Sequence, residues 1–61
     1  MNIYENVLAE AKKQGKSILQ IEQASNLSNG TISKWNSSKP RIDRIQRVAE
    51  VLGVPLEKLI K

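Results

Sequence analysis

The amino-acid sequence predicts an all-α fold made of five short helices, with no strand. Apolar residues recur at intervals of three and four, which is the spacing of one buried face on a helix. Serine, asparagine or proline stands at the expected start of several of these segments, where it can cap or open a helix. Glycine or asparagine stands at the expected end of three of them, where the backbone can turn left-handed.

The first helix is expected from Ile3 to Gln14. Asn2 and Glu5 have the N-x-x-E spacing of a capping box, in which free amides at the helix start gain acceptors. One face repeats apolar residues at positions i, i+3, i+4 and i+7, namely Tyr4, Val7, Leu8 and Ala11. Gly15 then ends the helix, because glycine accepts a left-handed backbone at little cost.

The second helix is expected to begin directly after Ser17. This serine caps the helix and forms another capping box with Gln20, three residues further on. The apolar residues of the helix are Ile18, Ile21 and Ala24. Asn26 ends it, since asparagine is the residue after glycine that best tolerates the left-handed position, and Leu27 points inward from the turn.

Ser28 is predicted to cap the third helix, which carries Ile32 and Trp35 on its buried side. Two short helices joined by a tight turn form a helix-turn-helix, a motif that places the start of its second helix in a DNA groove. Trp35 could instead be a stacking platform for single-stranded bases, but its spacing from Ile32 favours the core. Tyr4 is the only other aromatic residue, so the composition does not indicate a base-stacking surface.

The rest of the chain is expected to form a loop and two more helices. Residues 37–40 are a loop, since proline biases the residue before it away from helix. The fourth helix spans Ile42 to Leu52, is stopped by Gly53, and has an apolar stripe made of Ile42, Ile45, Val48, Ala49 and Leu52. Pro55 opens the fifth helix at its first position, and the apolar side of that helix consists of Leu56, Leu59 and Ile60.

Composition narrows the class of protein. The 61 residues are expected to form one domain, residues 1–61, and they include neither cysteine nor histidine, which excludes disulfides and the usual zinc sites. The carboxylates are scattered and the three glycines lie apart, so we predict no enzyme, cofactor, metal or small-molecule site. No apolar run is long enough for a membrane span and nothing resembles a signal peptide, so a cytoplasmic protein is the simplest expectation.

The net charge of +4 is concentrated in the second half of the chain. Acidic and basic residues cancel over residues 1–27. Further on, Asp43 is the only acid in the short stretch that holds Lys34, Lys39, Arg41, Arg44 and Arg47. A local basic surface of this kind attracts polyanions such as nucleic acids, although a basic face kept for solubility is the alternative at this point.

Small polar residues fill the opening of the third helix, Ser28–Thr31. Free backbone amides at such an opening can bind a phosphate. Asn29, Ser33 and Lys34 lie away from the buried side and can face outward, where asparagine can pair with adenine and lysine can reach guanine. Gly30 either leaves room for close approach to DNA, which we favour, or is a tolerated glycine that costs up to about 1 kcal/mol of helix stability.

The pattern S-x-x-x-I-E-x-x-x-x-L-S-N-G-T-I-S-K-W over residues 17–35 resembles the helix-turn-helix of the lambda-repressor and Cro-like family, also called the Xre family. Its last nine residues are particularly similar to members from Gram-positive bacteria and their phages. Downstream, S-S-K-P-R-I-D-R-I-Q-R-V-A-E-V-L-G-V-P-L is similar to the family's proline loop, fourth helix and short fifth helix. The resemblance covers almost the whole chain and implies a lambda-repressor-like DNA-binding domain.

The resemblance also implies which residues contact DNA. The base-reading positions on the groove-facing side of the third helix are Asn29, Gly30, Ser33 and Lys34. The positions that contact phosphates beside the groove are Ser17, Ser28 and Thr31. The basic loop after the third helix, which grips the DNA backbone, contributes Lys39 and Arg41.

Three positions depart from the usual pattern of this family. Ile18 replaces the glutamine that clamps a phosphate, so that contact is expected to be absent or taken over by Ser17 or Lys16. Glu22 replaces an alanine where the two helices of the motif touch, which implies a more open packing or a buried hydrogen bond. It is the one candidate for a perturbed acid, and a structural role is expected rather than catalysis. Asn26 replaces the turn glycine, as the backbone argument permits.

The function expected from these residues is sequence-specific binding of double-stranded DNA to regulate transcription, in the simplest case repression by occupying an operator. A domain of this size offers a small interface, so we expect two copies on a palindromic site with half-sites about 34 Å apart. The residues proposed for a homodimer contact are Leu56, Leu59 and Ile60, which can equally complete the core of the monomer.

Two alternatives stay open at this point. The chain is either a complete Cro-like protein or the amino-terminal domain of a longer repressor. A protein-interaction module such as an antitoxin can share the same fold, although no extra segment for wrapping a toxin is visible.

Overall fold

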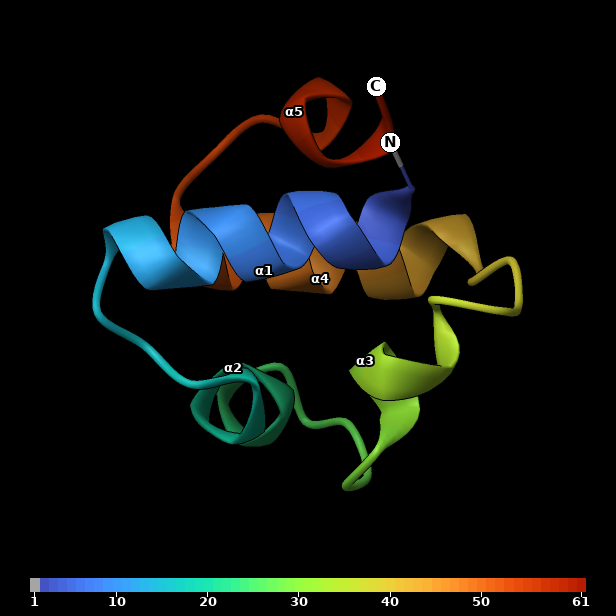
Figure 1. Ribbon diagram of the computed structural model, residues 1–61, viewed down its shortest axis with the longest axis horizontal. Helices are drawn as coiled ribbons and strands as arrows, with labels where there is room; N and C mark the ends of the chain where they lie inside the picture. The colour runs from blue at the N-terminus through green and yellow to red at the C-terminus, as the bar shows by residue number, and fades with distance from the viewer. Residues whose placement is uncertain (1) are drawn as a thin grey trace.

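The computed structural model describes residues 2–61, which form five helices and no strand, as predicted. The helices are α1 (Ile3–Lys13), α2 (Ile18–Ala24), α3 (Thr31–Lys34), α4 (Ile42–Leu52) and α5 (Leu56–Ile60). α1 and α4 run in the same direction and form the middle of the molecule, with α2 and α3 on one side and α5 on the other (Figure 1). No helix among the described residues is long and apolar enough to cross a membrane.

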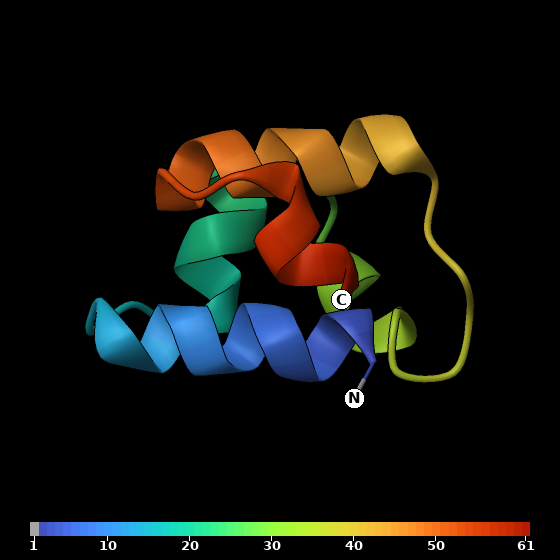
Figure 2. The same cartoon turned by 90° about the horizontal axis from the view of Figure 1, so that it is seen from above.

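All five helices contribute to one hydrophobic core. In the view from above, α2 and α5 cross between α1 and α4 (Figure 2). The buried apolar side chains that meet there are Val7, Ala11, Ile21, Ile32, Trp35, Ile45, Val48, Ala49, Leu52 and Leu59. Trp35 is only 6% exposed, which confirms its predicted place in the core and leaves no ring face for stacking on bases.

The helix starts follow local sequence signals. Both predicted capping boxes are present, one between Asn2 and Glu5 and the other between Ser17 and Gln20. In each box the side chain of the cap residue accepts a backbone N–H of the first turn, and the side chain three residues on accepts the N–H of the cap residue.

Three helix ends also agree with the prediction. The residues that follow α1, α2 and α4 in left-handed conformation are Gly15, Asn26 and Gly53, with φ of 68°, 60° and 70°. After each of them the next amide donates back across the last turn, for example from Lys16 N–H to the Ala11 carbonyl at 2.9 Å. This six-to-one bond is that of a Schellman motif, which satisfies carbonyls that the helix itself leaves free.

Two predictions about α4 and α5 are wrong in detail. Ile42 does not belong to the buried stripe of α4, since it is 59% exposed. It is the first residue of α4, and this end of α4 extends past the start of α1 (Figures 1 and 2). Pro55 is the cap residue of α5 and not its first helical residue, because α5 begins at Leu56.

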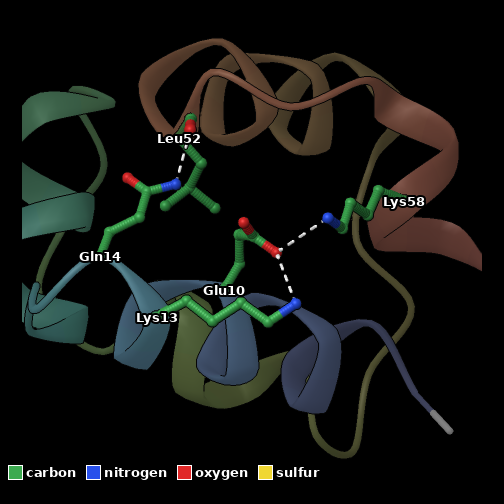
Figure 3. Close-up of polar contacts among 5 residues, drawn as sticks. All are labelled: Glu10, Lys13, Gln14, Leu52 and Lys58. Atoms are coloured by element: carbon green, nitrogen blue, oxygen red, sulfur yellow. Dashed lines mark hydrogen bonds and ion pairs between the residues drawn. The ribbon is translucent and has the colours of Figure 1, made fainter.

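Polar side chains of α1 and of its C-cap residue, Gln14, bind the C-terminal part of the chain. Glu10 is 8% exposed, and its carboxylate lies 4.0 Å from Lys13 Nζ and 3.6 Å from Lys58 Nζ (Figure 3). Gln14 Nε2 donates to the Leu52 carbonyl at 2.7 Å, at the end of α4 (Figure 3). α1 thus binds the end of α4 and the middle of α5 at the same time.

The C-terminal end of α5 is held by Asn6 of α1. Asn6 Nδ2 donates to the Leu59 carbonyl at 2.7 Å and to the Lys61 carbonyl at 2.8 Å. Carbonyls in the last turn of a helix lack partners within the helix, so this amide supplies what α5 cannot supply itself.

The three apolar residues of α5 have different surroundings. Leu59 is fully buried and Leu56 is half-buried against the core, whereas Ile60 is 44% exposed. The prediction of a shared dimer patch is therefore wrong for Leu59, because α5 packs with that side against the rest of the monomer.

Leu59→Ala is expected to lower the free energy of unfolding by about 2–5 kcal/mol, since it removes a fully buried side chain from the core. Ile60→Ala is the matched control on the neighbouring residue, and its loss should stay below about 1 kcal/mol because the side chain is largely exposed. Urea unfolding followed by Trp35 fluorescence measures both. Equal losses would show that Leu59 does not carry the packing of α5.

Candidate nucleic-acid interface

The turn between α2 and α3 is held at both ends by one residue, Glu22. Its backbone carbonyl accepts the N–H of Leu27 at 2.8 Å, which closes the Schellman motif at the end of α2. Its side-chain atom Oε1 accepts the N–H of Gly30 at 3.2 Å, and Oε2 accepts the N–H of Ile32 at 2.9 Å. The residue is only 3% exposed; its bond with Ile32 is buried and its bond with Gly30 is partly buried.

The start of α3 differs from the sequence prediction. Ser28 does not cap this helix: α3 begins at Thr31, its cap residue is Gly30, and no side chain of the cap position bonds to it. Ser28 instead offers its backbone carbonyl to the N–H of Thr31 at 3.1 Å. The Glu22 carboxylate takes the place of a capping serine, and it comes from the preceding helix and not from the local sequence.

The prediction that free backbone amides at Ser28–Thr31 bind a phosphate is wrong for Gly30 and Thr31, and the next amide, that of Ile32, is not free either. The N–H groups of Gly30 and Ile32 donate to Glu22, and that of Thr31 donates to Ser28. The carboxylate also supplies the negative charge that the N-terminal end of a helix favours. These three amides are therefore already paired within the protein.

Gly30 is required by the backbone of the turn. Its φ is +87°, a left-handed value that costs L-residues other than glycine about 1–2 kcal/mol. Space is not the reason within the protein, because a Cβ built on Gly30 meets nothing within 4 Å. The interpretation of Gly30 as a tolerated glycine inside a helix is wrong, since it precedes the helix. Its close approach to DNA stays a prediction.

The structure leaves most of the predicted DNA-contacting residues at the surface. Among the base-reading candidates, Asn29, Ser33 and Lys34 are exposed and Gly30 is half-buried, while the neighbouring Ile32 is fully buried. Among the phosphate candidates the exposed residues are Ser17, Ser28, Lys39 and Arg41, and the half-buried residue is Thr31. α3 therefore has a buried apolar side and an accessible polar side.

The start of α2 offers a hydroxyl to the solvent. Ser17 Oγ accepts the N–H of Gln20 at 3.1 Å, which leaves its own O–H proton free to donate. Ile18, the residue that replaces the usual phosphate-binding glutamine, is half-buried and packs against the core. Ile18 therefore has a packing role.

The segment between α3 and α4 is a loop, as predicted, and it is tied at two points. The Lys34 carbonyl accepts the N–H of Ser37 at 3.1 Å and that of Ser38 at 2.8 Å. Asn2 Nδ2 donates to Asn36 Oδ1 at 2.9 Å, which links the loop to the start of α1. The sequence predicts only the capping box of Asn2, because no local pattern indicates a partner 34 positions away.

The ion pairs of the described residues lie in α1, in α5 and at Lys61, and none lies near α3. Among residues 2–61, every ion pair joins residues of α1, α5 or the C-terminal Lys61. In the same part of the chain, no carboxylate lies within ion-pair distance of Lys34, Lys39 or Arg41, and no cluster of acidic residues could hold a metal. The basic groups near α3 are therefore available to an external polyanion.

Comparison with known families gives one match. A family model described as helix-turn-helix, HTH_3, matches residues 8–59, which is well over half of the chain. The comparison with curated proteins found no match, and the comparison with solved structures found none either.

Gly30→Ala is expected to lower the free energy of unfolding by about 1–2 kcal/mol, because alanine is strained at the left-handed φ of this position. Gly30→Asn should lose less, since asparagine tolerates this conformation better. Thermal or urea unfolding of the three proteins tests the order glycine, asparagine, alanine. An alanine variant as stable as the parent would mean that the turn does not need the left-handed residue.

Proposed function

The chain belongs to the DNA-binding helix-turn-helix family of the Cro/C1 type, and from this premise we propose that it is a transcriptional repressor that acts by occupying its operator. The family is one of DNA-binding domains and not of enzymes. The observation that best supports the proposal is the exposed polar side of α3, next to basic residues that have no partner in the described chain.

In the proposed complex α3 lies in the major groove of double-stranded DNA. Asn29, Ser33 and Lys34 contact base edges, because a major groove presents a distinct set of donors and acceptors for each base pair. Gly30 lies at the end of the helix that enters the groove, where the lack of a side chain lets the backbone approach closely. These contacts give the preference for one sequence.

Phosphate contacts supply the remaining affinity in this proposal. Lys39 and Arg41 on the α3–α4 loop bind phosphates through charge, and their exposure and lack of acidic partners support this role. Ser17, Ser28 and Thr31 add neutral donors beside the groove. Such contacts fix the register of the protein on the duplex without reading its sequence.

We further propose that two copies bind a palindromic operator. A single α3 has four residues and contacts a short run of bases, so a second copy is needed for useful affinity and selectivity. Half-sites about 34 Å apart place two recognition helices on the same face of the duplex. Of the apolar residues of α5, Ile60 remains exposed enough to contribute to contact between the copies.

Selection of bound duplexes from a random pool is the direct test. The expected result is a palindrome with two half-sites separated by about one helical turn. A promoter overlapping that sequence should then be transcribed less in the presence of the protein, whereas increased transcription would indicate an activator. Absence of any enriched duplex, together with no salt-dependent binding, would favour a protein-interaction module instead.

Asn29→Ala is expected to relax the preference at one base pair, with a loss of about 1–3 kcal/mol on the selected site, because it removes paired hydrogen bonds to a base edge. Binding titrations against the selected site and its single-base variants measure this effect. A variant that discriminates between these duplexes as well as the parent would exclude Asn29 from base reading.

Lys39→Ala is expected to weaken binding to all duplexes alike and to lower the slope of log K against log salt by about 1, since one phosphate contact is lost. Lys12→Ala is the matched control. It removes the same charge from an exposed position on α1, away from the α3–α4 loop, and should leave the slope almost unchanged. Equal slopes for the two variants would mean that Lys39 does not contact the backbone.

A further inference from the structure

We propose that Glu22, although it is buried and touches no DNA, is the positioning residue on which sequence discrimination by α3 depends. The inference rests on the proposed function and adds a determinant that lies behind the reading surface. Its basis is a pair of hydrogen bonds in which the Glu22 carboxylate accepts the backbone N–H groups of Gly30 and Ile32. These two residues lie on either side of Thr31, the first residue of α3.

The two bonds restrain both the position and the direction of α3. One carboxylate oxygen holds Gly30 just before the helix, and the other holds Ile32 inside its first turn. Two restrained amides define a direction, whereas one would leave the helix free to rotate about a single contact. The base-reading candidates Asn29 and Ser33 lie directly on either side of this restrained segment, so their placement depends on it.

Few other contacts fix the position and direction of α3. The helix has four residues, which is too short to be stable by its own hydrogen bonds. No side chain of its cap residue bonds to its amides. Its other attachments are the packing of Ile32 and Trp35 in the core, which is non-directional compared with a hydrogen bond, and the bond from Asn2 to Asn36 beyond the end of the helix.

The charge of Glu22 matters as well as its shape. Hydrogen bonds from backbone amides to an ionised carboxylate are stronger than bonds between neutral groups. A negative charge is also stabilised near the N-terminal end of a helix, which carries a partial positive charge. Glutamine has the same size but presents one oxygen and one NH₂ group. In Glu22→Gln one of the two amides therefore loses its acceptor and faces a donor.

The first measurement needs no DNA. Hydrogen exchange of the backbone amides is followed by NMR in the parent and in Glu22→Gln. The Gly30 and Ile32 amides should be protected in the parent, and at least one of them should exchange roughly tenfold faster in the variant. Glu50→Gln is the control, because it removes the same charge from an exposed residue of α4; it should change neither amide.

The second measurement is the ratio of affinities for the selected duplex and for a scrambled duplex. Glu22→Gln is expected to reduce this ratio roughly tenfold and to leave the salt slope unchanged, since phosphate-binding side chains remain. Glu50→Gln corrects for the general effect of one lost negative charge. A mere loss of stability would lower the folded fraction and thereby reduce both apparent affinities by the same factor, so their ratio would stay constant.

The outcomes separate the two proposals. If the parent selects no duplex, the proposed function fails, and the role of Glu22 in discrimination fails with it. If the parent selects a site and Glu22→Gln keeps the full ratio, only the positioning role is overturned. Faster exchange at Gly30 or Ile32 together with a reduced ratio supports it.

Discussion

The buried contact between Glu22 and the backbone at the start of α3 is the constraint on which the placement of the exposed polar side of α3 depends. A single residue accepts three amides, that of Leu27 through its carbonyl and those of Gly30 and Ile32 through its side chain. These bonds cover the whole turn between α2 and α3. Because the Glu22 residue is only 3% exposed, these charge-assisted hydrogen bonds are screened less by water than bonds at the surface.

This contact also limits which backbone groups at the start of α3 are free to bind an external phosphate. Helix starts commonly bind phosphates through free amides, but here the carboxylate already uses two of those groups. In the proposed complex, phosphates are bound by side chains such as Lys39, and the bases by the exposed residues of α3. On the opposite side of the molecule, Glu10 lies near two lysines and Asn6 binds the end of α5.

Much of the fold could be predicted from the sequence because its signals are local. The two capping boxes and the three left-handed helix ends each involve residues within a few positions of one another. Helical periodicity identified nearly all of the core, including Trp35. Ile42 is an exception, because it fits the period of α4 and is nevertheless 59% exposed.

The sequence by itself determined where most helices begin and end, which faces are apolar, and which polar and basic residues can lie outward near α3. Only the tertiary structure decided what caps α3, which amides are already used, and that Leu59 belongs to the core while Ile60 does not. The physical reason is distance along the chain. Glu22 and Ile32, or Asn2 and Asn36, meet only after the helices have packed, and no local pattern of residues encodes such a meeting.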